Sequence, residues 1–253
     1  MGTLDFLARH WFGVVVYVVI HLALYYLFMV VLSKKHVKFH KNKEVLEKFE
    51  PFNRIDVDNW TLANTLPGVL LFLPRMLLWI LNSTLYTIVF SLITIDLDKE
   101  KDTLKGGRRK LMRMISNFLT RFSCFIAGIV WIDVDYVAAG EGDYSKWLGP
   151  DWKPEWNRAG AVILNHHCWM DILLGIYLFF PSFVAKKSTK EYPFVRKMAP
   201  LTDSIFIERA GTKEERIAAV KQIGERMKDN EISNRPPLLM FPEGATTNNL
   251  SLI

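Results

Sequence analysis

The chain has 253 residues, half of them hydrophobic, which predicts one or two domains with a sizeable core and favours a membrane-associated protein. Its 32 basic and 26 acidic residues give a net charge of +6, too modest and dispersed to indicate nucleic-acid binding, so anionic lipid or phosphate is the better match. The two cysteines, Cys124 and Cys168, exclude a disulfide framework and leave reduced thiols as the expectation.

Residues 11–32 form the first predicted element, because they contain no acidic or strongly basic side chain. As a helix these 22 residues would extend about 33 Å, which is enough to cross a bilayer. Asp5 precedes the run and no small-residue cleavage site comes after it, so a cleaved signal peptide is not predicted. Five lysines follow the run, and the positive-inside rule therefore places the rest of the chain on the cytoplasmic or matrix side.

Residues 62–95 are almost wholly apolar, with interruptions at Pro67, Pro74 and the Asn82-Ser83 pair. One straight helix of this length would reach about 51 Å, so a bent hairpin or two tilted helices are predicted instead. A polar stretch at 98–110 then marks a domain boundary. The expected organisation is an N-terminal anchor with a basic flank at 1–45, an apolar membrane-embedded hairpin with a basic linker at 46–110, and an α/β domain at 111–253.

Strands and helices alternate in the last of these regions. Short apolar runs predict strands at 128–136, 161–164, 182–186, 204–208 and 238–241. Helices are predicted at 171–180 and at 212–229, where Thr212 and Glu215 form a capping box. The fold class is therefore α/β, with a mixed or mainly parallel sheet flanked by helices and a site at the strand ends.

His166 and Asp171 are the candidate catalytic pair. Five residues of helix would rotate them about 500° apart, so they cannot both lie in the middle of a helix. His166 is therefore placed in the turn between the strand at 161–164 and the following helix. From the first turn of that helix the Asp171 carboxylate can accept one ring N–H, which leaves the other ring nitrogen free to take a proton as a general base.

The chain from residue 50 to 253 resembles the glycerolipid acyltransferases that carry an H-x4-D motif. Three further segments carry the resemblance: Phe206-Ile207-Glu208-Arg209 is similar to a phosphate-binding block, Phe241-Pro242-Glu243-Gly244 to a third motif, and Lys186-Lys187 fall where a strand of the family is basic. The continuation after Gly244 is closer to the lysophosphatidylcholine and lysophosphatidylethanolamine branch. The family continues beyond this point, so the domain is expected to be C-terminally incomplete relative to it.

Simpler interpretations stay open for several of these residues. Glu208 and Arg209 form a surface ion pair in one alternative, and Lys186 and Lys187 a solvated strand end in another. Cys168 is an alternative acyl nucleophile. No metal site is predicted, because the adjacent His167 and Cys168 lack a second ligand cluster.

The resemblance implies transfer of an acyl group from acyl-CoA, as co-substrate, to a lysophospholipid hydroxyl, with no bound cofactor. It assigns His166 as base and Asp171 as its orienting partner. Arg209, Glu208, Glu243, Gly244, Lys186 and Lys187 are then the candidate substrate-binding residues. Membrane lipids are the expected partners, and nucleic acid is not.

The alternative function is a catalytically inactive, acyltransferase-like structural subunit of a larger membrane complex. Intact His166 and Asp171 argue against it, whereas the early end of the motif series argues for it. The endoplasmic reticulum membrane is the favoured location, and the mitochondrial inner membrane is the alternative.

Overall fold

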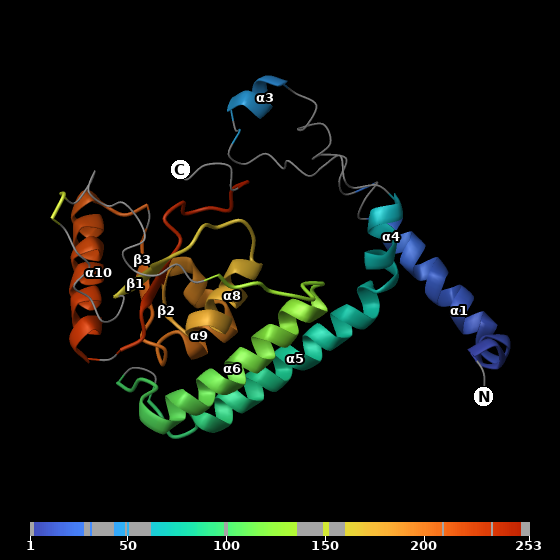
Figure 1. Cartoon of the computed structure of the whole chain (residues 1–253), viewed down its shortest axis with the longest axis horizontal. Helices are drawn as coiled ribbons and strands as arrows, with labels where there is room; N and C mark the ends of the chain where they lie inside the picture. The colour runs from blue at the N-terminus through green and yellow to red at the C-terminus, as the bar shows by residue number, and fades with distance from the viewer. Residues whose placement is uncertain are drawn as a thin grey trace. The chain divides into compact units, whose positions relative to one another are not determined.

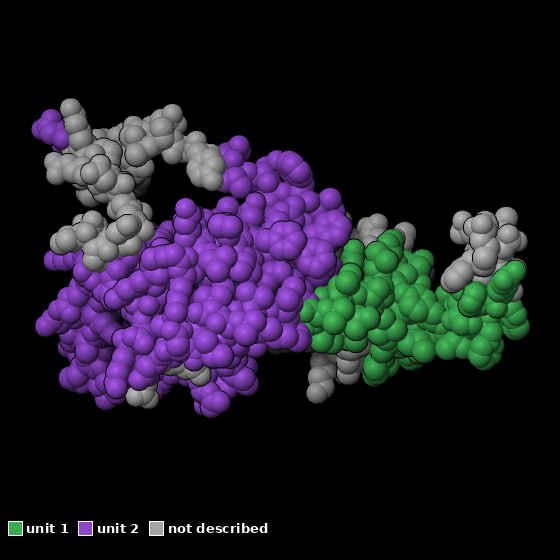
Figure 2. Space-filling view, turned by 90° about the horizontal axis from the view of Figure 1, so that it is seen from below, with its two compact units in different colours: residues 1–81, 245–253 green, residues 82–244 purple. Residues whose placement is uncertain are grey.

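The structure is a computed structural model that describes residues 3–27, 31, 43–48, 50, 62–98, 101–135, 149–151, 160–208, 210–233 and 235–248. It divides into two compact units, residues 1–81 with 245–253 and residues 82–244 (Figure 2). All the described residues that bear on the candidate site belong to the second unit.

The described residues of the first unit form α1 (Thr3–Tyr25), α3 (Lys43–Lys48), α4 (Leu62–Leu70) and the first part of α5 (Phe72–Ile93). α1 packs against α4, where the Tyr17 hydroxyl donates to the Leu70 carbonyl. The predicted membrane span at 11–32 is not confirmed, because the apolar part of α1 ends at Tyr25 and most of residues 28–42 lie outside the described residues.

α5 is instead the one helix, among the described residues, that is long and apolar enough to cross a membrane by length and composition. α4 and α5 follow each other with a break at Leu71, so residues 62–95 contain two consecutive helices, which agrees with the two-helix alternative and not with the bent hairpin. The antiparallel partner of α5 is α6 (Gly106–Ile126), and the two helices lie side by side (Figure 1). α6 begins inside the expected linker and was not predicted from the sequence.

Buried polar contacts hold α5 and α6 together. The Asn82 side chain donates to the Leu119 carbonyl at 3.0 Å and to the Ser123 hydroxyl at 2.8 Å. Tyr86 and Ser116 hydroxyls hydrogen-bond at 2.8 Å one turn further along. These pairs run in opposite sequence directions, and they satisfy polar groups that would otherwise be costly to bury.

In the described residues, the sheet of the α/β part has four strands, β1 (Ala161–Ile163), β2 (Ser182–Lys186), β3 (Ile205–Ile207) and β4 (Leu238–Met240). Every pairing is parallel and the strand order is β1-β4-β2-β3. The predicted strands at 161–164, 182–186, 204–208 and 238–241 are therefore present, with small differences at their ends. Parallel strands place all their carboxyl ends at one edge of the sheet and all their amino ends at the other.

Helices connect these strands across the sheet. α8 (Met170–Phe179) follows β1, the short η4 (Lys187–Glu191) and α9 (Pro193–Met198) follow β2, and α10 (Lys213–Ser233) follows β3. Because the β3–α10–β4 connection runs back across the sheet, a right-handed crossover puts α10 on the face opposite α8. α8 also packs against α6, and a shared core that includes Phe90, Met112, Phe180 and Leu201 joins the helical pair to the α/β part.

The helix at 212–229 is confirmed as α10, with its capping box formed by Thr212 and Glu215. Two of its apolar side chains, Ile217 and Val220, are exposed. The predicted strand at 128–136 is wrong for residues 128–135, which have no strand partner in the described structure. The Arg121 guanidinium donates to the carbonyls of Ile129 and Val130. These carbonyls are therefore hydrogen-bonded by a side chain and not by the backbone of another strand.

Candidate active site

His166 lies in the turn between β1 and α8, at the carboxyl edge of the sheet. The amide of Leu164 donates to the Met240 carbonyl at 3.1 Å and extends the pairing of β1 with β4 by one residue. The chain then turns through residues 165–169 and enters α8, of which Asp171 is the second residue. The predicted placement of His166 in a strand-to-helix turn is confirmed.

Asp171 accepts hydrogen bonds from three consecutive residues of that turn. One carboxylate oxygen, Oδ2, lies 3.1 Å from His166 Nδ1, 2.6 Å from the amide nitrogen of His167 and 2.8 Å from that of Cys168. The other oxygen, Oδ1, lies 3.8 Å from Cys168 Sγ, which donates to it. A carboxylate in the first turn of a helix is also favoured by the helix dipole. The carboxylate therefore fixes both the turn and the imidazole ring.

This arrangement gives the two ring nitrogens of His166 different roles. When Nδ1 carries the proton that it donates to Asp171, Nε2 is left as the nitrogen able to accept one. The ring stacks on Phe241 with centroids 4.3 Å apart and planes 26° apart, so its orientation is held from a second side. Both members of the pair are largely covered, with side chains 19% and 15% exposed. A histidine held in this way is suited to proton abstraction.

Glu243 and Gly244 come from the turn that follows β4, at the same edge of the sheet. The Glu243 carboxylate accepts from the backbone N–H of His166 at 3.1 Å. The Gly244 amide donates to the Phe241 carbonyl at 3.1 Å, and its φ of 68° lies in the left-handed region that glycine adopts without strain. The sequence motif around Glu243 thus contacts the backbone of His166 directly.

An apolar pocket of about 290 Å³ begins at His166, Phe241 and Gly244. It continues past Ile176 and Phe183 to Pro181, and its lining is mostly apolar. Such a cavity beside a polar reacting group is typical of a site for a ligand with an aliphatic part.

Of the other predicted binding residues, only some lie at the apolar pocket. Lys186, the last residue of β2, lines the apolar pocket, whereas the neighbouring Lys187 begins η4 and is not part of the lining; both side chains are exposed. Glu208 is exposed and accepts from the Ala210 amide at 3.4 Å. Arg209 lies outside the described residues.

Several aromatic side chains of this site, among them Phe241 and Phe206, were not predicted from the sequence to belong to it. Phe241 was recognised only as part of a motif, although an aromatic ring directly after a buried strand was the available signal. Phe206 lines the pocket, and the Lys190 ammonium lies 4.7 Å from the centre of its ring. Across the described part of the chain, no group of three His, Cys, Asp or Glu side chains is arranged to hold a metal ion.

The parallel sheet and the paired His166 and Asp171 at its carboxyl edge are accompanied by a direct family match. The model of the acyltransferase family matches residues 151–253, which include both residues and the Glu243 turn. Residues 151–253 of this chain are therefore similar to the acyltransferase family.

Curated relatives support the same family. The chain is 27% identical over 155 residues to the lysophospholipid acyltransferase LPEAT1 of Arabidopsis thaliana, which covers 57% of this chain and 39% of the relative. It is 36% identical over 101 residues to a lyso-ornithine lipid O-acyltransferase of Rhizobium meliloti (strain 1021), covering 39% of this chain and 32% of the relative. A lyso-ornithine lipid O-acyltransferase of Rhodobacter capsulatus is 32% identical over 94 residues, covering 37% and 32%.

The chain thus spans only 32% to 39% of the length of these relatives. No solved structure matches the chain. None of these three relatives is named as a structural subunit, so the alternative of an inactive membrane-complex component gains no support.

Proposed function

We propose that this chain transfers a fatty acyl group from acyl-CoA to the free hydroxyl of a lysophospholipid or related lyso-lipid. The observation that carries the proposal is the pairing of His166 Nδ1 with Asp171 at the mouth of an apolar pocket. The names of the relatives, which act on lysophospholipids and lyso-ornithine lipid, point to the same class of acceptor.

In the proposed reaction His166 Nε2 takes the proton of the acceptor hydroxyl as its oxygen attacks the thioester carbonyl. The C–S bond then breaks and the thiol of coenzyme A leaves with a proton. Asp171 holds the ring in the tautomer that exposes Nε2 and stabilises the imidazolium that forms. Glu243 accepts a hydrogen bond from the backbone of His166 and so helps to hold the imidazole ring in position.

The apolar pocket is the proposed place of an aliphatic chain. Burying a chain there offsets the cost of leaving a hydrocarbon environment, about 0.8 kcal/mol for each methylene. Lys186 lines the same pocket and is the proposed contact for the acceptor phosphate, together with Arg209, whereas Lys187 and Glu208 are secondary candidates. Amides near Gly244 are the proposed donors to the developing oxyanion.

Membrane association is part of the proposal, because both substrates are lipids. α5 is long and apolar enough to enter a bilayer, and many of its large side chains are exposed, among them Leu77, Leu81, Ile88 and Leu92. An exposed apolar surface of this kind marks a membrane or protein contact rather than a solvated face.

The test is acyl transfer by the whole chain in dodecylmaltoside micelles. Radiolabelled palmitoyl-CoA is supplied with lysophosphatidylethanolamine, lysophosphatidylcholine, lysophosphatidate or lyso-ornithine lipid, and diacyl product is separated by thin-layer chromatography. His166→Gln is compared with His10→Gln, a matched change at an exposed histidine of α1.

Product formation that is lost in His166→Gln and kept in His10→Gln supports the proposal, and the best acceptor defines the substrate. Equal product from His166→Gln and the unchanged chain would show that His166 is not the base. A folded chain with no turnover on any acceptor would contradict the proposed activity.

A further inference from the structure

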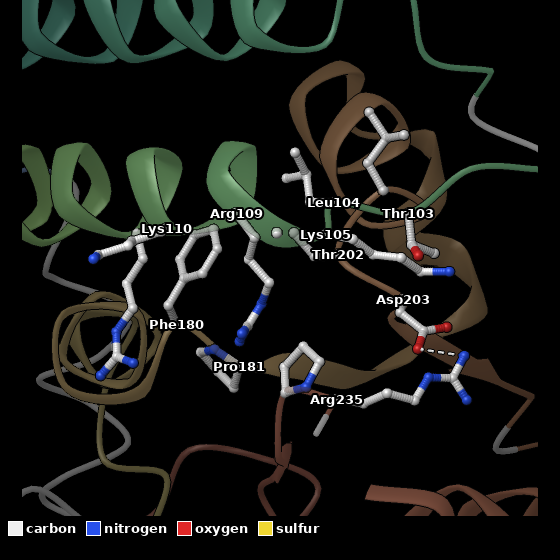
Figure 3. Close-up of a pocket in the computed structure, with 14 residues that line it drawn as sticks. Thr103, Leu104, Lys105, Arg109, Lys110, Phe180, Pro181, Thr202, Asp203 and Arg235 are labelled. Carbon is white, nitrogen blue, oxygen red and sulfur yellow. Dashed lines mark ion pairs between the residues drawn. The ribbon is translucent and has the colours of Figure 1, made fainter. Parts of the chain in front are cut away.

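A second cavity, of about 600 Å³, lies at the opposite edge of the sheet from His166. It is lined by residues that precede three strands: Pro181 before β2, Asp203 before β3, and Arg235 with Pro236 before β4. Because the strands are parallel, these positions mark their amino ends, whereas His166 and Glu243 follow the carboxyl ends. The first turns of α6 form the other wall of the cavity (Figure 3).

The lining of this cavity is strongly basic. Among the described residues of the lining, Asp203 is the one acidic side chain, against five cationic ones: Lys105, Arg109, Lys110, Arg113 and Arg235. Figure 3 shows Arg109 reaching down from α6, Lys105 running sideways above Asp203 and Arg235 lying on the other side of Asp203, whereas Lys110 points away from Arg235. The Arg109 guanidinium also lies 5.9 Å from the centre of the Phe180 ring.

Asp203 does not neutralise this charge, because two guanidinium groups already share its carboxylate. Its Oδ2 atom lies 2.9 Å from Arg226 Nη2 and 3.0 Å from Arg235 Nη2. Arg226 is buried, and its Nε and Nη1 atoms have no hydrogen-bond partner among the described residues. Arg235 also pairs with Asp229 through Nη1, so these two guanidinium groups are matched by two carboxylates. The excess positive charge of the lining therefore comes from the basic residues 105, 109, 110 and 113.

The amino end of α6 adds to the positive potential. Lys105 is the N-cap residue and supplies no side-chain cap, and Gly106, the first residue of the helix, lines the cavity. The first-turn amides of a helix attract anions, and the planar guanidinium fork of arginine matches phosphate oxygens. Thr103 adds a hydroxyl to the same lining, whereas the hydroxyl of the neighbouring Thr202 donates to the carbonyls of Met198 and Ala199.

We infer that this cavity binds the phosphate group of a second molecule, distinct from the reacting acceptor. β2 has five residues, so about 16 Å of strand separates Pro181 from the edge that bears His166. The phosphate and free hydroxyl of one lyso-lipid are only a few bonds apart and cannot reach both places. The inference rests on the charges of the cavity and stands whether or not His166 catalyses acyl transfer.

Two sources carry this chemistry: the headgroup of an anionic phospholipid and a soluble phosphate. The cavity adjoins the residues that follow the apolar helix α5, where lipid headgroups would be available. The experiment measures binding of inorganic phosphate, dihexanoylphosphatidate and dihexanoylphosphatidylcholine to the whole chain in dodecylmaltoside, by isothermal titration calorimetry at low and high ionic strength. The detergent carries no charge and does not compete.

The variants are Lys105→Gln, and Lys105→Gln with Arg109→Gln. Arg108→Gln is the matched control, because Arg108 lies in the same helical turn but makes a bidentate ion pair with Asp96 and does not line the cavity. We expect an affinity loss of about tenfold for each cavity cation removed and less than about twofold for the control. The affinity also falls with ionic strength.

Tight binding of dihexanoylphosphatidate with weak binding of inorganic phosphate identifies a lipid source, and comparable binding of both identifies soluble phosphate. Either pattern, together with the variant losses, supports the site. The site would be overturned if neither inorganic phosphate nor dihexanoylphosphatidate bound, or if Arg108→Gln and Lys105→Gln lost affinity equally. Lys105 is exposed, so its single variant tests the site even where the double variant unfolds.

Discussion

Glu243 accepts a hydrogen bond from the backbone N–H of His166 at 3.1 Å, although 77 residues separate the two in the chain. This contact joins the turn after β4 to the turn after β1. It makes Glu243 a positioning residue for the imidazole as well as a candidate contact for substrate.

Replacing Glu243 is therefore expected to act mainly on kcat. Glu243→Ala removes the acceptor and lets the His166 turn shift, which we expect to lower kcat by about 10- to 100-fold. Glu243→Gln retains an oxygen acceptor and should lose less. The measurement is steady-state acyl transfer with the acceptor concentration varied. A raised acceptor KM with unchanged kcat would assign Glu243 to substrate binding instead.

Asp171→Asn tests the orientation of the catalytic ring. The amide keeps the size of the side chain but loses the charge that stabilises imidazolium, so kcat is expected to fall about 10³- to 10⁴-fold. Thermal denaturation of the variant checks the fold, because Asp171 also accepts from the His167 and Cys168 amides. Activity within tenfold of the unchanged chain would rule out the proposed role.

Because Arg226 is buried, we expect removal of the Asp203 charge to have a large effect on the stability of the fold. Burial lowers the pKa of Arg226, and the nearby Asp203 carboxylate opposes that shift. Asp203→Asn leaves a buried guanidinium without its counter-charge and is expected to destabilise the fold by about 3–5 kcal/mol. Arg226→Met removes both the charge and the need for a partner, so it should cost less. Urea unfolding of the two variants gives the comparison, and a reversed order would contradict the proposed charge pairing.

Two glycines provide a matched test of packing between α10 and the sheet. A Cβ on Gly160 would lie 2.7 Å from the Met227 carbonyl oxygen, whereas one on Gly224 would meet no atom within 4 Å. Gly160→Ala should destabilise the protein by about 1–3 kcal/mol, because the contacted atom is backbone. Gly224→Ala should stabilise it by up to about 1 kcal/mol through helix propensity. Thermal melting of both variants measures the difference.

The exposed ion pair of Asp96 and Arg108 predicts that the stability of the fold depends on pH. Hydrogen bonding to the Arg108 guanidinium holds the pKa of the Asp96 carboxyl below its usual value. Because the folded pKa is the lower one, the pair stabilises the fold above the unfolded pKa, about 3.9, and this contribution disappears as pH falls through the folded pKa. Carboxyl-carbon NMR titration should show the Asp96 pKa rising in Arg108→Gln. An unchanged titration would exclude the pairing in solution.

The sequence determined the local parts of this protein. Short apolar runs predicted the strands at 161–164, 182–186 and 238–241, the Thr212–Glu215 capping box predicted the start of α10, and the His166-to-Asp171 spacing placed the histidine in a turn. These features depend on residues within a few positions of one another, where propensity, capping and helix periodicity act directly.

Contacts between residues that are far apart in the sequence became known only from the tertiary structure. Asn82 was interpreted as an interruption of an apolar hairpin, but it contacts α6, and Arg121 satisfies the carbonyls of a segment that was predicted to be a strand. The strand order β1-β4-β2-β3 brings Glu243 to His166 and gathers Lys105, Asp203 and Arg235 around one cavity. Such contacts follow from chain crossovers and shared burial, which local sequence patterns do not encode.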